Sequence, residues 1–338
     1  MIFETISNRK EFGESCQVRR KQILGREREI PHVLGSWSFG SGCYRKGKQV
    51  KIRSLTIGAA AALALAGCAS PGSGDMEIEA EATKVVSNAE VAEAEPAGIC
   101  VGSGPQTPRD ITNMSGLNKI LFELAPPPQK MNLCNIHAHK HAEHKGPGFS
   151  VFVNSSDQGG YACNDRDSLT EEQLRDPFEG KGAFKGVKPG DTIEVHWVYT
   201  SCDAAPGEGL GACAPETCSD PVLRVEAQTF LVVNDPTALD FNTFDTSGVR
   251  ETGGYYQPQA LPDGTGEPVV FRGSTTGPSY TQTTCSPLQV TWSVRPQCAR
   301  VDITSLHEWV AKGNVFNETE PHGVRQLVTA PELLSPIE

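Results

Sequence analysis

The stretch Asp191-Thr-Ile-Glu-Val-His-Trp-Val-Tyr199 alternates between two kinds of residue, as a β-strand does. On such a strand Glu194, His196 and Val198 share one face, and the large apolar residues between them share the other. A strand whose apolar face is this bulky packs against a core. The stretch therefore predicts a central strand that presents one histidine on its second face.

Three further runs have the β-branched and aromatic character of strands, namely Phe149–Val153, Val222–Val233 and Leu288–Val294. Long loops rich in proline and glycine separate them, notably 201–221 and 234–280. Ser305-Leu-His-Glu308 has the pattern of a capping box and predicts a short helix that runs to Lys312. We expect a β-rich α+β fold, a single domain around a large, mainly antiparallel, twisted sheet.

Eight cysteines follow residue 98 at scattered spacings, without CxxC pairs. An even count of this kind predicts up to four disulfides in an oxidising compartment, where they would staple the long loops. A cysteine-rich zinc site would need closer spacing. The eight are Cys100, Cys134, Cys163, Cys202, Cys213, Cys218, Cys285 and Cys298.

The N-terminal part of the chain resembles an exported lipoprotein. A short apolar run ends in Leu65-Ala-Gly-Cys68, which has the form of a lipobox, so we expect residues 50–67 to be a signal peptide and Cys68 to carry lipid. Residues 1–49 then have no evident role, and we interpret them as a gene-start artefact. We expect residues 68–97 to hold the lipidated Cys68 and a flexible acidic linker, and residues 98–338 to form the folded, functional domain. We expect placement in the cell envelope, facing the periplasm or the surface, at the outer membrane.

Charge excludes one class of partner. Residues 1–67 hold 12 Lys+Arg and 5 Asp+Glu of the chain's 30 and 41, which leaves 18 and 36 in the remainder, a net charge near −18. Such an acidic protein is not expected to bind nucleic acid. We expect contact with a membrane only through the lipid anchor, and the sequence does not indicate an oligomeric state.

Four of the eight histidines lie in Ile136-His-Ala-His-Lys-His-Ala-Glu-His144. On a strand His137 and His139 point to the same face, where two imidazoles can take neighbouring corners of a zinc tetrahedron. A solvated, histidine-rich tract is the competing interpretation. His196 favours the metal site, because Glu194 on the same face can accept a hydrogen bond from its second ring nitrogen. Three histidines leave one position open, as in catalytic zinc sites.

These segments together resemble a known enzyme family. His137-Ala-His139 with Glu143-His144, then Glu194-Val-His196, then Gly273-Ser-Thr-Thr276 and Val290-Thr-Trp292 are similar to ordered motifs of alpha-class carbonic anhydrases. The cysteine-rich setting, Cys134-Asn-Ile and Gly104-Pro-Gln-Thr-Pro-Arg-Asp110 look more like the delta class. The resemblance runs through most of residues 98–338.

The resemblance implies reversible hydration of CO2 to bicarbonate and a proton by a zinc-bound hydroxide, with an alpha-carbonic-anhydrase-like fold. It implies one Zn²⁺ per chain, for which Co²⁺ or Cd²⁺ could substitute. Glu143 matches the family's buried glutamate. Thr276 is the expected threonine, although counting from Trp292 points to Thr283 or Thr284, and Thr275 is adjacent. Val198, Val290 and Trp292 are expected to line the CO2 pocket.

Other functions remain open from the sequence. The chief alternative is a periplasmic lipoprotein that binds zinc or copper without catalysis. Another zinc hydrolase, such as an esterase, and a silent relative that binds a carbohydrate or a protein are further alternatives. Of the other histidines, we expect His141 to be exposed or a proton shuttle, His144 to make a structural hydrogen bond beside Glu143, and His307 and His322 to lie on the surface.

Overall fold

A computed structural model describes residues 98–100, 102–154, 159–251 and 253–338. The expected signal peptide, the lipid-bearing Cys68 and the linker fall outside these residues. No helix among the described residues has the length and apolar character needed to cross a membrane.

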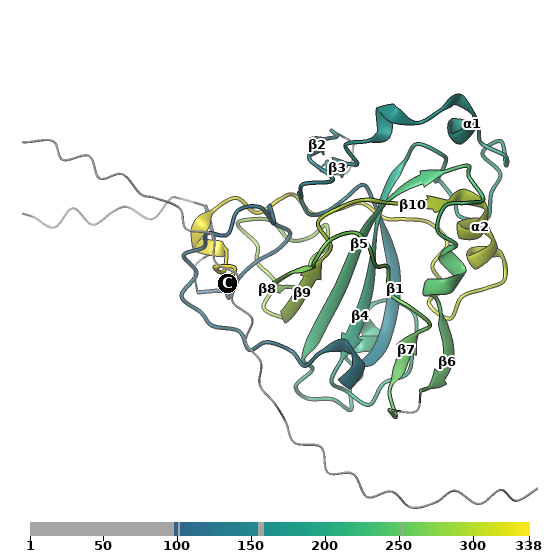
Figure 1. The fold of residues 1–338 in the computed structure, drawn as a ribbon. Helices are drawn as coiled ribbons and strands as arrows, with labels where there is room; N and C mark the ends of the chain where they lie inside the picture. The colour runs from purple at the N-terminus through teal and green to yellow at the C-terminus, as the bar shows by residue number, and fades with distance from the viewer. Residues whose placement is uncertain (1–97, 101, 155–158, 252) are drawn as a thin grey trace, which may run out of the picture. The chain divides into compact units, whose positions relative to one another are not determined.

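A six-stranded sheet forms the centre of the described domain, with five strands in the order β1-β4-β5-β9-β8 and the sixth, β10, paired to β5 (Figure 1). The β1–β4, β4–β5 and β8–β9 pairs are antiparallel, whereas β9 and β10 pair with β5 in parallel. The expectation of a single, β-rich and mainly antiparallel sheet domain is confirmed. The strands are β1 (Asn132–Lys140), β4 (Thr192–Thr200), β5 (Leu223–Val233), β8 (Val269–Ser274), β9 (Gln289–Val294) and β10 (Ala299–Asp302).

The remaining elements are short and lie around this sheet. The pairs β2–β3 and β6–β7 are two-stranded, and α2 packs beside β10 (Figure 1). Their bounds are β2 (Val151–Phe152), β3 (Tyr161–Ala162), β6 (Thr246–Arg250), β7 (Tyr256–Pro258), α1 (Glu171–Leu174) and α2 (Ile303–Ala311). Single 3₁₀ turns span Pro128–Lys130, Arg166–Ser168, Leu210–Cys213, Phe241–Phe244 and Pro331–Leu333.

The strand β4 is buried along its whole length because both faces of the sheet are covered. On one face Trp197 is fully buried among aromatic residues and donates its indole N–H to the carbonyl of Phe244, 2.9 Å away. On the other face Val198 packs with Val225 and Trp292 in a second apolar cluster. The alternation of the sequence thus separates the structural core from the face that carries His196.

Three expectations about elements are wrong in part. The helix predicted from Ser305 begins two residues earlier, at Ile303, and no capping box forms. The Ser305 hydroxyl instead donates to the carbonyl of Asp302 and accepts from the amide of Phe241. The interval 234–280 is not one loop, because it contains β6, β7 and β8. Only two residues of the run at Phe149–Val153 pair as a strand.

All eight cysteines that follow residue 98 are joined in four disulfides, as expected. Two of them hold the loop 201–221: Cys202–Cys218 closes it, and Cys134–Cys213 ties it to β1. The other two are Cys100–Cys285 and Cys163–Cys298. The loop that follows β4 is therefore fixed against the strand that carries His137 and His139.

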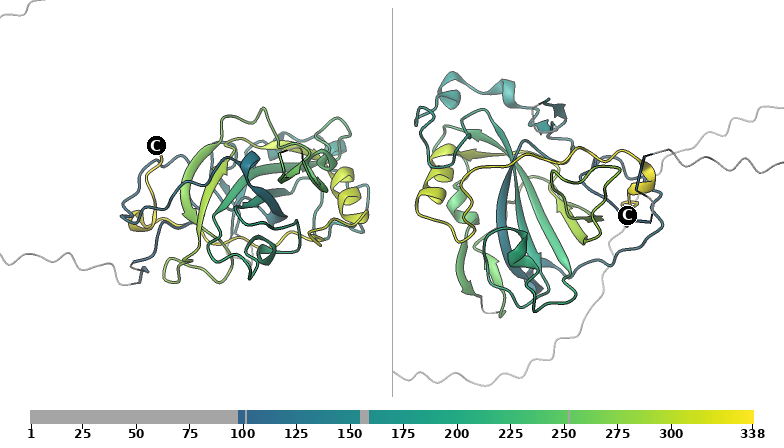
Figure 2. Two further views of the ribbon diagram at one scale, coloured as in Figure 1. Left: turned by 90° about the horizontal axis from the view of Figure 1, so that it is seen from below. Right: turned by 180° about the vertical axis from the view of Figure 1, so that it is seen from behind.

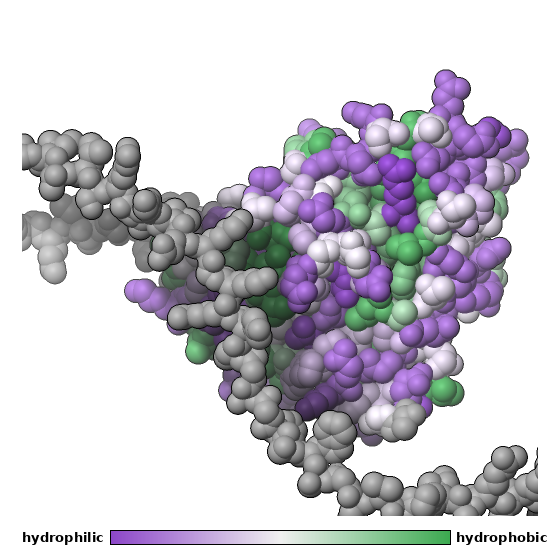
Figure 3. Space-filling model, in the orientation of Figure 1, coloured by the Kyte–Doolittle hydropathy of each residue, from purple (hydrophilic) through white to green (hydrophobic). Residues whose placement is uncertain are grey.

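The C-terminal segment after α2 returns along the sheet to the end of the chain (Figure 2). It pairs with the free edge of β1, where the amide of Lys140 donates to the carbonyl of His322 and the amide of His322 donates to the carbonyl of Ala138. The face drawn in Figure 3 is largely hydrophilic, with apolar residues in separate patches, as expected for an acidic chain.

Candidate metal centre

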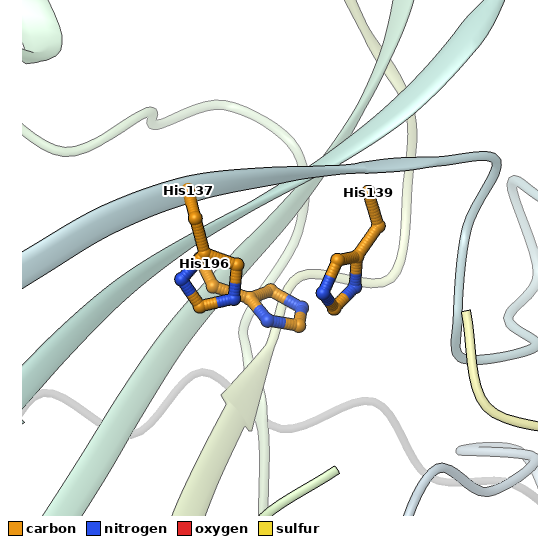
Figure 4. A group of neighbouring side chains, drawn as sticks. All are labelled: His137, His139 and His196. Carbon is orange, nitrogen blue, oxygen red and sulfur yellow. The ribbon is translucent and has the colours of Figure 1, made fainter. Parts of the chain in front are cut away.

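Three histidines come together because two antiparallel strands place them opposite one another. His137 of β1 pairs directly with His196 of β4, and His139 pairs with Glu194. One ring nitrogen from each of His137, His139 and His196 lies within 4.8 Å of the others (Figure 4). His139 and His196 are buried, with 3 % and 1 % of their surface exposed.

Each of these rings has its second nitrogen beside an oxygen atom. Nδ1 of His137 lies 2.6 Å from Oδ1 of Asn135, Nδ1 of His139 lies 2.9 Å from Oε2 of Glu143, and Nε2 of His196 lies 3.5 Å from Oε1 of Glu194. The last two contacts are not well aligned as hydrogen bonds. The arrangement leaves Nε2 of His137, Nε2 of His139 and Nδ1 of His196 for a ligand.

This donor set fits a zinc ion. Three neutral imidazoles are a common set for catalytic zinc, and carboxylate or amide partners on the far nitrogens orient such rings. Burial, with the neighbouring imidazoles adding to it, lowers the pKa of His137 well below its usual value, so the ring stays neutral and its lone pair is free. A second buried group, His144 with Glu194 and His196, shares only His196 with the first, and His144 does not reach the cavity.

Glu194 stabilises the site through buried hydrogen bonds. Its carboxylate accepts hydrogen bonds from the backbone amides of Glu143 and His144, and it lies 3.1 Å from Nδ1 of His144. Burial raises the pKa of Glu194, but the His144 and His196 rings outweigh burial and hold it well below its usual value. Glu194 therefore stays anionic and fixes both the third histidine and the turn after β1. His144 thus makes the structural hydrogen bond that the sequence predicts, and its partner is Glu194.

Thr276 is the threonine that the fold brings to Glu143. Its hydroxyl donates to Oε2 of Glu143 across 3.2 Å, and both residues line the cavity. The hydroxyl of Thr275 instead pairs with Ser286, and that of Thr283 pairs with Thr281 on the surface. Burial raises the pKa of Glu143. The rings of His139, His196 and His144 lower it by more than burial raises it, so the net shift of this pKa is downward.

The histidines open into a cavity of about 470 Å³ whose wall is largely apolar. Val198, Val290 and Trp292, the residues expected in the substrate pocket, all line it and are at most 3 % exposed. Leu223 and Val225 of β5 extend the same wall. Leu210, from the disulfide-held loop, lies at the cavity too, so this loop contributes to the pocket.

Several residues at the site were not found from the sequence. Asn135 has the same strand parity as His137, a signal that could have identified it. Glu318, His322 and Arg325 come from the C-terminal segment, which carries no motif, and all three line the cavity. The expectation of a surface role is wrong for His307, which is buried and accepts a hydrogen bond from the amide of Phe184. His322 is exposed, as expected, but it lies at the cavity. His141 lies outside this cavity and is half-buried.

Comparison with known proteins identifies the family of the chain. The family model described as "Delta carbonic anhydrase" matches residues 128–305, more than half of the chain, including both strands that carry the histidines. The chain belongs to the delta carbonic anhydrase family. It is thus a carbonic anhydrase, with CO2 and bicarbonate as substrate and product, and the family implies a metal ion at its centre.

Among solved structures, an alpha-carbonic anhydrase from Photobacterium profundum is similar to this carbonic anhydrase. The two are 17 % identical over 66 % of this chain and 88 % of that one, with a TM-score of 0.21. No curated protein matches the chain. The matched range of the family model ends before the segment that carries Glu318, His322 and Arg325.

Proposed function

We propose that this enzyme hydrates CO2 with a zinc ion held by His137, His139 and His196. The observation that carries the proposal is the set of three imidazoles, each with its second nitrogen beside an oxygen, at the base of an apolar cavity. When bound, zinc lowers the pKa of a coordinated water to about 7, a value known for carbonic anhydrases as a class and not one calculated for this chain.

Thr276 and Glu143 would orient the nucleophile. The single hydrogen of the Thr276 hydroxyl is donated to Glu143, so only the lone pairs of its oxygen face the cavity. The lone pairs can accept a hydrogen bond, but the hydroxyl has no second hydrogen to donate. This selects one orientation of the oxygen that attacks CO2. Glu143 is buried, and its lowered pKa keeps it an acceptor at neutral pH.

The apolar wall would hold the substrate. CO2 carries no charge and is a weak hydrogen-bond acceptor, so Val198, Val290 and Trp292 can bind it without losing a polar contact of their own. The indole N–H of Trp292 is already engaged, because it donates to the carbonyl of Ser274 across 3.1 Å. A protein that only stores metal would need neither this wall nor the Thr276–Glu143 pair.

The test is a CO2-hydration assay with metal analysis on the purified protein and its His196→Ala variant. We expect one zinc per chain in the wild-type protein, and in the variant a loss of both zinc and activity. His141→Ala is the matched control, because this histidine lies outside the ligand set and should leave zinc content unchanged. Stoichiometric zinc without hydration activity in the wild-type protein would contradict the enzymatic role of the site.

We also propose that the enzyme is a lipoprotein of the cell envelope at the outer membrane, anchored through Cys68. The support is the lipobox Leu65-Ala-Gly-Cys68 after a basic and then apolar stretch. Membrane fractionation of cells that express the natural gene should place the protein in the outer membrane, and Cys68→Ser should release it. Recovery of the wild-type protein from the inner membrane or the medium would contradict this placement.

A further inference from the structure

His322 is fixed beside the metal ligands by backbone pairing. Two hydrogen bonds join it to the edge of β1, one at 3.1 Å to the carbonyl of Ala138 and one at 2.8 Å from the amide of Lys140. The carboxylate of Glu318, four residues earlier, accepts from the amide of Ala138 across 3.0 Å. Because Ala138 lies between His137 and His139, the C-terminal segment is held at the metal-binding part of β1.

The ring of His322 belongs to the same cluster as the ligand rings. Its centroid lies 4.5 Å from that of His139 and 5.3 Å from that of His137, nearly parallel to the latter. The centroids of the ligand rings lie at similar distances from one another, 4.5 to 5.1 Å. A fourth imidazole therefore stands against two of the three ligands.

Two features separate His322 from the ligands. It is exposed at the cavity, whereas His139 and His196 are buried. Its nitrogens are also outside the group whose ligand atoms all lie within 4.8 Å of one another. An ion that enters from solvent can therefore meet a nitrogen of His322 before it reaches the three nitrogens that finally hold it.

A zinc ion in water must shed its hydration shell before the nitrogens of His137, His139 and His196 can bind it, and exchange of one water at a time for one imidazole divides this cost into steps. We propose that His322 is the imidazole that first receives the ion in the cavity and passes it to His137 and His139. This inference rests on the proposed zinc site, and it assigns His322 a part in metal uptake and release rather than in final coordination.

The rate of zinc binding tests this role. Zinc-free protein is mixed with zinc in a stopped-flow instrument, and the dissociation constant is measured by competition with a chelator. For His322→Ala we expect the association and dissociation rate constants both to fall about tenfold, with the dissociation constant within about twofold of wild type. A residue that only assists passage changes both directions equally.

His322→Phe is the matched variant, because phenylalanine keeps a ring that can pack on His137 but has no nitrogen. We expect it to bind zinc as slowly as His322→Ala. Wild-type rates in His322→Phe would show that the ring only packs, and would overturn the inference. So would a dissociation constant at least tenfold weaker with an unchanged association rate, since that result makes His322 a permanent ligand.

The same measurements keep the two proposals apart. If wild-type protein fails to bind one zinc per chain, the proposed metal centre fails, and the inference with it. If wild-type protein binds one zinc and the His322 variants bind it equally fast, only the inference fails. Circular dichroism of the zinc-free variants shows whether they are folded, and Glu318→Gln, which keeps the acceptor for Ala138, controls for disturbance of the segment.

Discussion

At the scale of single residues, the metal centre depends on how each imidazole is turned. Asn135 offers a neutral amide oxygen to His137, whereas Glu143 and Glu194 offer carboxylates to the other two rings. The carboxylates also hold other groups, since Glu143 accepts from Thr276 and Glu194 from backbone amides. A change at any of these partners should therefore affect both the ring and the structure around it.

Thr276 gives the sharpest residue-level prediction. Thr276→Val removes the hydroxyl that joins Glu143 to the cavity but keeps the size of the side chain. We expect kcat/KM for CO2 hydration to fall about a hundredfold, the scale of losing one preorganised hydrogen bond at a reacting centre. Zinc content should not change, because Thr276 is not among the ligands. Stopped-flow hydration measurements give the rate.

Thr275→Val is the control for that variant. Its hydroxyl pairs with Ser286 and lies in the same loop, so the variant measures the cost of disturbing the loop without touching Glu143. If the two variants lose activity equally, Thr276 has no special part in the reaction.

Strand parity explains which site residues could be predicted. It placed His196 beside Glu194 and Val198, and His137 beside His139, because alternation needs no knowledge of the rest of the fold. Thr276 and Glu143 came from short motifs, and only the fold shows that their side chains meet. His322 could not be predicted, because its position depends on backbone pairing with a strand far away in the sequence.

At the scale of elements, the C-terminal segment brings an unusual acid to the cavity. Burial raises the pKa of Glu318 to about 7, with the Ala138 amide opposing the shift and Glu320 adding to it. The folded state therefore holds the proton more tightly than the unfolded state, in which the pKa is near 4.5. The stabilisation from this group is complete below about pH 4.5 and is lost as the pH rises to about 7.

The variant Glu318→Gln tests the direction of this pH dependence of stability. Glutamine stays neutral at every pH and keeps an oxygen for the amide of Ala138. For the zinc-free protein, we expect the free energy of unfolding of the variant to exceed that of wild type more at pH 8 than at pH 5, as measured by urea denaturation. Glu320→Gln, on the exposed side of the segment, should show a smaller dependence. A difference that does not change with pH would contradict the raised pKa.

Elements were predictable where their sequence is regular over many residues. The central strands β4, β5 and β9 come from long apolar alternation. The strand β8 was hidden because Val269–Ser274 mixes apolar residues with arginine and glycine, and β10 has only four residues. The start of α2 was misplaced because the serine of the apparent capping box is used in tertiary hydrogen bonds.

At the scale of the whole molecule, disulfides join segments that the sheet does not. Cys163–Cys298 closes a separation of 135 residues, whereas Cys202–Cys218 closes one of 16. The number of disulfides was foreseeable from the even cysteine count, but the pairing was not, because it depends on which loops meet. In the chain-entropy account, a longer closed loop stabilises the folded state more.

We expect loss of Cys163–Cys298, by paired serine substitution, to lower the free energy of unfolding by about 5 kcal/mol, against about 3 kcal/mol for loss of Cys202–Cys218. Urea denaturation under non-reducing conditions, with the other bridges intact, measures both. The reverse order would mean that packing around each bridge, and not the length of its loop, determines its effect.

The pairing of the C-terminal segment with β1 determines when, during synthesis of the protein, the metal centre can be completed. The strand that carries His137 and His139 is synthesised well before the segment that covers its edge, since Ala138 and Glu318 are 180 residues apart. Until that segment has been made, β1 has an open edge and the histidines lack one wall of their cavity. The metal centre is therefore completed late in synthesis, and a protein without residues 318–338 would have ligands but no finished pocket.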